Sequence, residues 1–310
     1  CYNNTINKNW SYDLLQIDLL DSMALTNFTC FLPDFSALEN YEKNATHISE
    51  TKYPWIAKVI HSSIADVPYM CTASCIKERV FITAARCLVD LKVKYTKVIY
   101  QNKHHLPAQA FVTPSKPTKQ AYDDIGFIVV QIRKLFKRKG YQQVQLYNGL
   151  NRTDSEYQWF KTLPTEGYMA IGYASILVNI NKCWIVYLSR KVIVTIGLDI
   201  CAKILTHALK EVYHVPCYHS CTVAQFVKRD PLCNNYHGVK GSAIIEIKSN
   251  KLLGVATWGV FYNNDLNLPS GISVVNSENF FKDYKCAMAI AKEKTIQPEP
   301  LYWQTLCDNL

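Results

Sequence analysis

From Tyr53 onward the chain alternates between short apolar runs and polar turns. The runs are rich in β-branched and aromatic residues, and their regular spacing is typical of an all-β sandwich or barrel. The pattern therefore predicts an all-β fold. The clearest predicted strands are residues 55–60, 79–84, 97–100, 125–132 and 169–173.

Two further segments each contain a pair of apolar runs divided by a short polar turn. The first spans residues 183–196 with a turn at Ser189–Lys191, and the glycine that follows ends its second run. The second spans residues 242–258 with a turn at Ser249–Lys251. Each segment predicts a β-hairpin.

Two segments instead have apolar residues three and four positions apart, which favours a helix. The first runs from Ile200 to Leu209. The second follows Ser277, a residue type that caps helix N-termini. It places four apolar or aromatic side chains on one face, namely Phe280, Phe281, Tyr284 and Met288.

The first fifty residues do not follow this pattern of apolar runs, because they are polar and rich in Asn. We interpret residues 1–50 as an N-terminal extension, 51–290 as one domain and 291–310 as a C-terminal tail. No apolar run reaches the roughly 18 residues that span a bilayer. The chain begins at Cys1 without a signal-peptide pattern, as expected for a mature secreted protein.

The composition indicates the compartment in which the protein is expected to occur. The chain has 12 cysteines, an even number that suits disulfides in an oxidising environment. Five glycosylation sequons occur, at Asn3, Asn9, Asn27, Asn44 and Asn151. Together these features predict a secreted, disulfide-bonded glycoprotein.

The net charge of +9 raises the question of an anionic partner. The densest basic cluster lies between Arg133 and Lys139. It reads either as a solvated loop or as a contact for an anionic protein or glycosaminoglycan. No aromatic residues interleave with it, so nucleic acid is not an expected partner.

Four zinc-ligand types also lie close together, at His214, Cys217, His219 and Cys221. In a secreted protein disulfides account for such cysteines better than a metal does. We therefore expect neither a metal nor a cofactor.

Short motifs then follow one another in a recognisable order. In the first half they are Tyr53–Trp55, Cys71–Ile76, Val80–Cys87 and Asp123–Phe127. In the second half they are Gly238–Ala243, Thr257–Gly259, Gly271–Ser273 and Phe280–Ile290. Over residues 53 to 290 the series resembles the trypsin-like serine proteases. The resemblance implies two perpendicular six-stranded β-barrels, a C-terminal helix and a Cys71–Cys87 disulfide.

The departures from the family's motifs concern its chemistry. The mechanism needs a histidine base, an acid that orients it and a serine nucleophile. Arg86 stands at the base position and Lys240 at the nucleophile position, whereas Asp124 retains the acid. A guanidinium stays protonated in proteins and cannot act as a base. We expect no catalytic residues here, and we expect Asp124 to pair with Arg86 or Lys240 because a lone buried carboxylate is costly.

A shift of two residues in the alignment would make Ser242 the nucleophile, and this alternative stays open. It would still leave no histidine at the base position. The family's activation switch is also missing, since nothing at Glu42–Ala45 resembles its cleavage site. Val239 stands where the family has the aspartate that receives the freed amine.

The cysteine pattern departs as well. The resemblance places a family disulfide at Tyr168 and Glu246, where both cysteines are absent. It also suggests that Cys201 pairs with Cys217 or Cys221. Four further cysteines have no family counterpart, and one of them is a candidate for bonding to a partner chain: Cys75, Cys183, Cys286 and Cys307.

Inactive relatives of such proteases serve as cofactors in immune protease cascades or as subunits of extracellular and reproductive assemblies. The resemblance therefore implies a secreted, non-catalytic protein that binds other extracellular proteins. Two rivals are a hydrolase that uses Ser242 and a module that binds anions or glycosaminoglycans.

Overall fold

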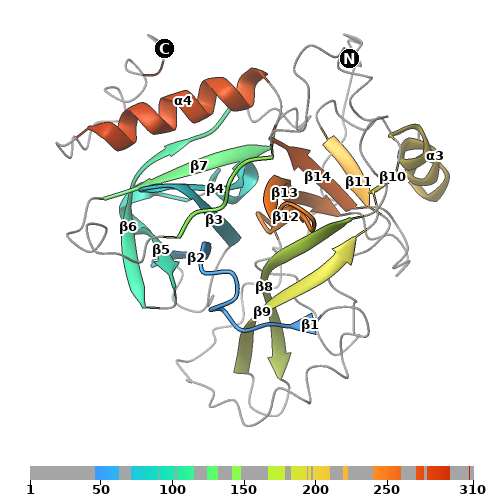
Figure 1. Cartoon of the computed structure of the whole chain (residues 1–310), viewed down its shortest axis with the longest axis horizontal. Helices are drawn as coiled ribbons and strands as arrows, with labels where there is room; N and C mark the ends of the chain where they lie inside the picture. Colours follow the sequence, from blue (N-terminus) through green and yellow to red (C-terminus); the bar gives the residue numbers. More distant parts are fainter. Residues whose placement is uncertain are drawn as a thin grey trace.

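The computed structural model describes most of the domain and little of either end. The described residues are 46–62, 71–89, 91–101, 103–114, 124–131, 142–147, 167–178, 183–193, 195–196, 198–209, 219–222, 240–259, 270–275, 278–293 and 307. The chain forms a closed β-barrel and a second β-sheet, with a long helix near the C-terminus (Figure 1).

Six strands close the barrel in the order β2-β3-β4-β7-β6-β5. They are β2 (Ile56–His61), β3 (Cys71–Lys77), β4 (Val80–Ala84), β5 (Thr96–Tyr100), β6 (His104–Val112) and β7 (Ile125–Val130). All neighbours pair antiparallel. The first predicted barrel is thus confirmed.

Burial along these strands follows what covers them. In β5 buried and half-exposed residues alternate, because only one face meets the barrel interior. In β4 and β7 every residue is buried. Helix α4 (Glu278–Lys292) covers the outside of β7, where the Phe280 and Tyr284 rings lie 5.7 and 6.2 Å from the ring of Phe127. The predicted apolar face of this helix is confirmed.

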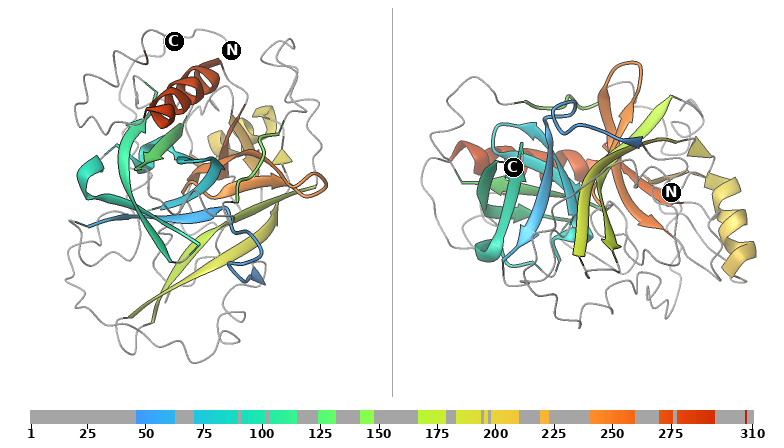
Figure 2. Two further views of the ribbon diagram at one scale, coloured as in Figure 1. Left: turned by 60° about the vertical axis from the view of Figure 1, so that its left-hand side comes forward. Right: turned by 90° about the horizontal axis from the view of Figure 1, so that it is seen from below.

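The second half of the molecule is a sheet with the strand order β1-β9-β8-β12-β13-β14-β11-β10. Its strands are β1 (Thr46–His47), β8 (Tyr168–Val178), β9 (Cys183–Ile193), β10 (Thr195–Ile196), β11 (His219–Thr222), β12 (Ala243–Glu246), β13 (Lys251–Gly259) and β14 (Ser270–Val274). The described residues thus give eight strands where the resemblance implied six, because the short strands β1 and β10 extend its two ends. Figure 2 shows this sheet beside the barrel from two further directions.

The hairpin predicted at residues 183–196 is wrong, because the residues predicted to form its turn belong to a strand. Ser189–Lys191 lie inside β9, where they pair with Gly172, Ile171 and Ala170 of β8. Because β8 offers backbone partners along its whole length, the polar run continues the strand. The hairpin actually joins β8 to β9, whereas the predicted hairpin of β12 and β13 is confirmed.

Helix α3 (Leu198–Leu209) and helix α4 lie where the apolar spacing predicted them. Strand β6 has no counterpart among the predicted strands. Its sequence includes Pro107 and few β-branched residues, so it lacks the usual strand signal. Pro107 still takes part in the sheet, since its carbonyl accepts a hydrogen bond from the Gln131 amide. No helix in the described part of the chain is both long and apolar enough to cross a membrane.

One buried arginine ties the barrel to the end of α4. Arg79 has a φ of 68° in the turn between β3 and β4, and it is 4% exposed. Its guanidinium donates to the carbonyls of Val130, Ala291 and Glu293, as well as to the Gln109 side chain. The carbonyls at the C-terminal end of the helix thereby gain a cationic partner.

The tail is attached to the same helix. Cys286 of α4 forms a disulfide with Cys307. Neither of these two cysteines is therefore available to bond a partner chain, which corrects that part of the expectation. The Cys75 thiol is buried and donates to the carbonyl of Lys77.

Candidate functional site

The pairing of β4 with β7 brings the base and acid positions together. Ala84 at the end of β4 lies opposite Ile125 at the start of β7, and the Ala85 amide donates to the Asp124 carbonyl at 3.1 Å. A short 3-10 turn, Ala85–Cys87, then directs Arg86 toward the Asp124 side chain. The Cys71–Cys87 disulfide anchors the end of this turn to the start of β3, as predicted.

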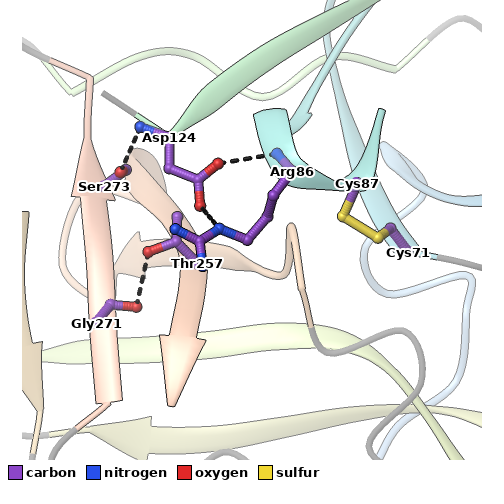
Figure 3. A network of polar contacts seen from close by, with 7 residues as sticks. All are labelled: Cys71, Arg86, Cys87, Asp124, Thr257, Gly271 and Ser273. Carbon is purple, nitrogen blue, oxygen red and sulfur yellow. Dashed lines mark hydrogen bonds and ion pairs between the residues drawn. A yellow bond between two sulfur atoms is a disulfide. The ribbon is translucent and has the colours of Figure 1, made fainter. Parts of the chain in front are cut away.

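Arg86 contacts both oxygens of the Asp124 carboxylate (Figure 3). Its backbone amide donates to Oδ1 at 2.9 Å, and its Nε forms an ion pair with Oδ2. The Asp124 amide in turn donates to Oγ of Ser273 at 3.2 Å. The expectation that Asp124 pairs with Arg86 or Lys240 is thus confirmed for Arg86.

The electrostatics of this pair are dominated by burial. The Asp124 side chain is 5% exposed and that of Arg86 is 20% exposed. Burial raises the pKa of the Asp124 carboxyl above its ordinary value. The charge and hydrogen bonds of Arg86 oppose this rise, and the charge of Lys240 opposes it more weakly. The carboxylate therefore interacts with two cations and accepts its side-chain hydrogen bonds from Arg86 alone among the described residues.

Lys240 lies in the turn that leads into β12. Its carbonyl accepts a hydrogen bond from the Thr72 amide at 3.0 Å, and the next amide, that of Gly241, donates to Ala256 at 2.8 Å. Gly241 has a φ of +81°, and a Cβ there would lie 2.2 Å from the Thr72 carbonyl oxygen. Only glycine fits this position. The backbone beside Lys240 is thus held between the barrel and the sheet.

Ser242 points into the packed interior. It is 3% exposed, and its carbonyl accepts a hydrogen bond from Ala256 in β13. A Cβ built on Gly172 of β8 would lie 1.8 Å from the Ser242 Oγ. The hydroxyl therefore packs directly against the backbone of a neighbouring strand, with no space between them for a substrate carbonyl.

Two strands of the sheet form the wall beside Asp124. Thr257 of β13 donates from Oγ1 to the carbonyl of Gly271 in β14 at 3.4 Å, and Ser273 of β14 reaches Asp124 (Figure 3). The motif 271–273 marked this strand, but nothing in the sequence indicated that its serine would contact the acid. Thr72 was likewise missed, because a threonine inside an apolar strand carries no distinct signal.

Tyr168 and Glu246, where the resemblance places a missing disulfide, are directly opposite each other on β8 and β12. The Tyr168 side chain is fully buried, and burial together with Tyr147 and Glu246 raises its pKa. A tyrosine ring thus fills the position of a cysteine. Cys201 is disulfide-bonded, while its two predicted partners differ in placement, since Cys221 is in β11 and Cys217 lies outside the described residues.

Several predicted features lie outside the described residues. They are the five sequons Asn3, Asn9, Asn27, Asn44 and Asn151, the Arg133–Lys139 cluster, the segment 42–45, His214 and Val239.

No protein-family model matches the chain, and no curated protein matches it in sequence. Solved protease structures do match in shape. The VesB protease of Vibrio cholerae matches with 15% identity and a TM-score of 0.54, and the match covers 79% of this chain and 66% of the VesB chain. Neuropsin of mouse brain matches with 14% identity and a TM-score of 0.55, and the match covers 78% of this chain and 98% of the neuropsin chain.

A third match is the scabies mite inactivated protease paralogue S-D1. It has 14% identity and a TM-score of 0.58, covering 83% of this chain and 99% of its own. The chain spans just under two thirds of the VesB chain, and identities this low establish the fold alone. The chain therefore has the fold of the trypsin-like serine proteases.

Proposed function

We propose that this chain is a catalytically inactive protein of the trypsin fold that acts by binding other extracellular proteins. The observation that carries the proposal is the Arg86–Asp124 ion pair. In the protease mechanism the acid orients a histidine, which removes the proton of the nucleophile. Here the acid holds a guanidinium, which has no lone pair with which to accept a proton.

The nucleophile position supports the same proposal. Lys240 is close enough for its positive charge to affect Asp124, and an ammonium is not a nucleophile while it stays protonated. The rival role of Ser242 has less support, since its hydroxyl packs against Gly172. The described hydrogen bonds of Asp124 involve Ala85, Arg86 and Ser273, and none of these residues is a histidine.

Different observations support the proposed location and the proposed role. Two disulfides, Cys71–Cys87 and Cys286–Cys307, suit an oxidising extracellular compartment, as do the five sequons. One structure with the same fold is described as an inactivated protease paralogue, so the fold is used without catalysis elsewhere. A chain that keeps a rigid scaffold without the chemistry is suited to binding, either as a cofactor in a protease cascade or as a subunit of an immune or reproductive assembly.

Labelling with a fluorophosphonate tests the inactivity. The probe modifies activated serines, so we expect no labelling of the intact protein under conditions where trypsin is labelled completely. Stoichiometric modification of Ser242 or of any other serine would overturn the proposal.

The binding role needs its own test. Affinity isolation from native extracellular material, followed by mass spectrometry, should recover a stable protein partner. An Arg86→His/Lys240→Ser variant serves as the control, since it changes the site and leaves the outer surface intact. Failure to recover any partner with either protein would count against the binding role without affecting the inactivity.

A further inference from the structure

The outer face of three barrel strands carries a concentration of lysines. From Leu91 to Tyr122 the sequence contains no aspartate or glutamate. The described lysines of this stretch are Lys92, Lys94, Lys97 and Lys103. They belong to β5 and its two flanks, so they lie on one side of the barrel.

The register of the sheet shows how this face is built. One row across β2, β5 and β6 contains Lys58, Ile99 and His105, and the next contains Ile60, Lys97 and Pro107. Residues of one row lie about 4.8 Å apart and the rows about 7 Å apart. Lys94 lies before β5 and Lys103 after it. We call these eight residues the β5 face.

The charge on the β5 face has one sign. Lys94 and Lys103 are exposed, and Lys97 is half-buried. None of the eight residues is acidic, and Glu50 reaches them from outside the face, with its carboxylate 3.4 Å from Lys58 Nζ. Lys94 Nζ lies 4.5 Å from the centre of the Tyr95 ring, which therefore holds the ammonium near the sheet.

The composition of the β5 face favours one kind of ligand. Cores of protein interfaces are depleted in lysine and enriched in arginine, tryptophan and tyrosine. The β5 face has four lysines and no arginine or tryptophan. A row of lysine ammonium groups on a sheet instead suits an extended polyanion, whose binding gains free energy from released counterions.

We propose that the β5 face binds a sulphated polysaccharide. The sulphates lie along β5 against Lys94, Lys97 and Lys103, while the sugar rings lie over Ile99 and Pro107. This site is separate from the Arg86–Asp124 network, and it does not depend on whether the chain is an enzyme.

The test measures the affinity of the full chain for a fluorescein-labelled heparin octasaccharide by anisotropy at several salt concentrations. A Lys94→Gln/Lys97→Gln/Lys103→Gln variant removes three charges from the β5 face. A control variant, Lys248→Gln/Lys282→Gln/Lys285→Gln, removes three exposed charges from the β12–β13 turn and α4. Thermal unfolding of all three proteins verifies that each is folded.

We expect the β5-face variant to bind the octasaccharide about tenfold or more weakly, with a shallower dependence of log Kd on log salt, as fewer counterions are released. The control should retain most of the affinity. Equal weakening of both variants would overturn the proposal, because net charge alone would explain it. Tighter binding of the wild type to a polyglutamate peptide or a DNA oligonucleotide of equal charge would also overturn it.

Discussion

At the scale of single residues, the site is governed by the cost of burying charge. Asp124 is 5% exposed, so its carboxylate requires a partner, and Arg86 supplies two hydrogen bonds and a charge. Removing one member of a buried pair costs more than removing both, because the other is left uncompensated. This asymmetry makes the ion pair accessible to experiment.

We expect Arg86→Met to lower the free energy of unfolding by about 3 kcal/mol at pH 7. The loss should be smaller near pH 4. Burial raises the pKa of the Asp124 carboxyl in the folded protein. Between the unfolded-state pKa and this higher folded-state pKa, the folded protein holds a proton that the unfolded chain has released, so stability falls as the pH rises between them. Urea unfolding at both pH values measures this. Arg86→Met/Asp124→Asn should recover much of the loss, and an equal loss at both pH values would contradict the explanation.

His61 provides a second residue-scale prediction. Its Nε2 accepts a hydrogen bond from the Lys92 amide at 3.1 Å, so the ring must be neutral at that nitrogen. Burial, and then the charge of Lys92, lower the pKa of His61 below 6.5. The unfolded chain therefore binds more protons, and the stability from this group is present above pH 6.5 and lost as the pH falls through the folded-state pKa.

The variant His61→Gln retains a side-chain acceptor for the Lys92 amide but has no group that titrates in this pH range. We expect the difference in unfolding free energy between pH 7.5 and pH 5 to be smaller in this variant than in the wild type. Urea unfolding at the two pH values measures that difference, and an unchanged difference would assign the pH dependence to other groups.

At the scale of elements, helix α4 depends on the barrel for its termination. The Arg79 guanidinium reaches the carbonyls of Ala291 and Glu293 at the end of the helix and that of Val130 at the end of β7. These carbonyls would otherwise lack a cationic partner at the negative end of the helix dipole. One residue of the β3–β4 turn therefore joins three elements.

We expect Arg79→Met to destabilise the protein by about 3 kcal/mol, because it leaves several partly buried carbonyls and the Gln109 side chain without their donor. Lys77→Met at the end of β3, two residues before Arg79, is the control, since Lys77 is exposed, and it should change stability by less than about 0.5 kcal/mol. Chemical denaturation measures both variants. Similar values for the two would show that the turn, and not the guanidinium, matters.

The sequence predicted elements well where propensity and burial agree. Strands β4 and β7 consist mostly of apolar residues, and their predicted positions agree with the structure to within two residues. The sequence pattern was misleading at two places. At β6, Pro107 weakens the strand signal, and at Ser189–Lys191 polar residues continue β9 because β8 supplies their hydrogen bonds. The positions of Arg86, Asp124 and Lys240 came from motifs. Their contacts with Ser273 and Thr72 depend on which strands meet across the molecule, and local patterns do not encode that.

At the scale of the whole molecule, the barrel and the sheet meet around Thr72. This residue is fully buried in β3, and its amide donates to the carbonyl of Lys240. Its carbonyl accepts from the Thr83 hydroxyl at 2.7 Å, and its own hydroxyl accepts from the Tyr173 amide of β8 at 2.9 Å. Thr72 thus connects two barrel strands to two parts of the sheet, next to the site.

The Thr72 hydroxyl therefore couples the two halves through a single buried amide. Thr72→Val keeps the shape but leaves the Tyr173 amide without that acceptor, which costs about 1–3 kcal/mol. Thr72→Ser retains the hydroxyl and should lose less. Hydrogen exchange of the Tyr173 amide, measured with urea unfolding, separates local from global effects. Faster exchange at Tyr173 in Thr72→Val, with little change in Thr72→Ser, is the expected result, and equal exchange in both variants would show that the halves are joined by other contacts.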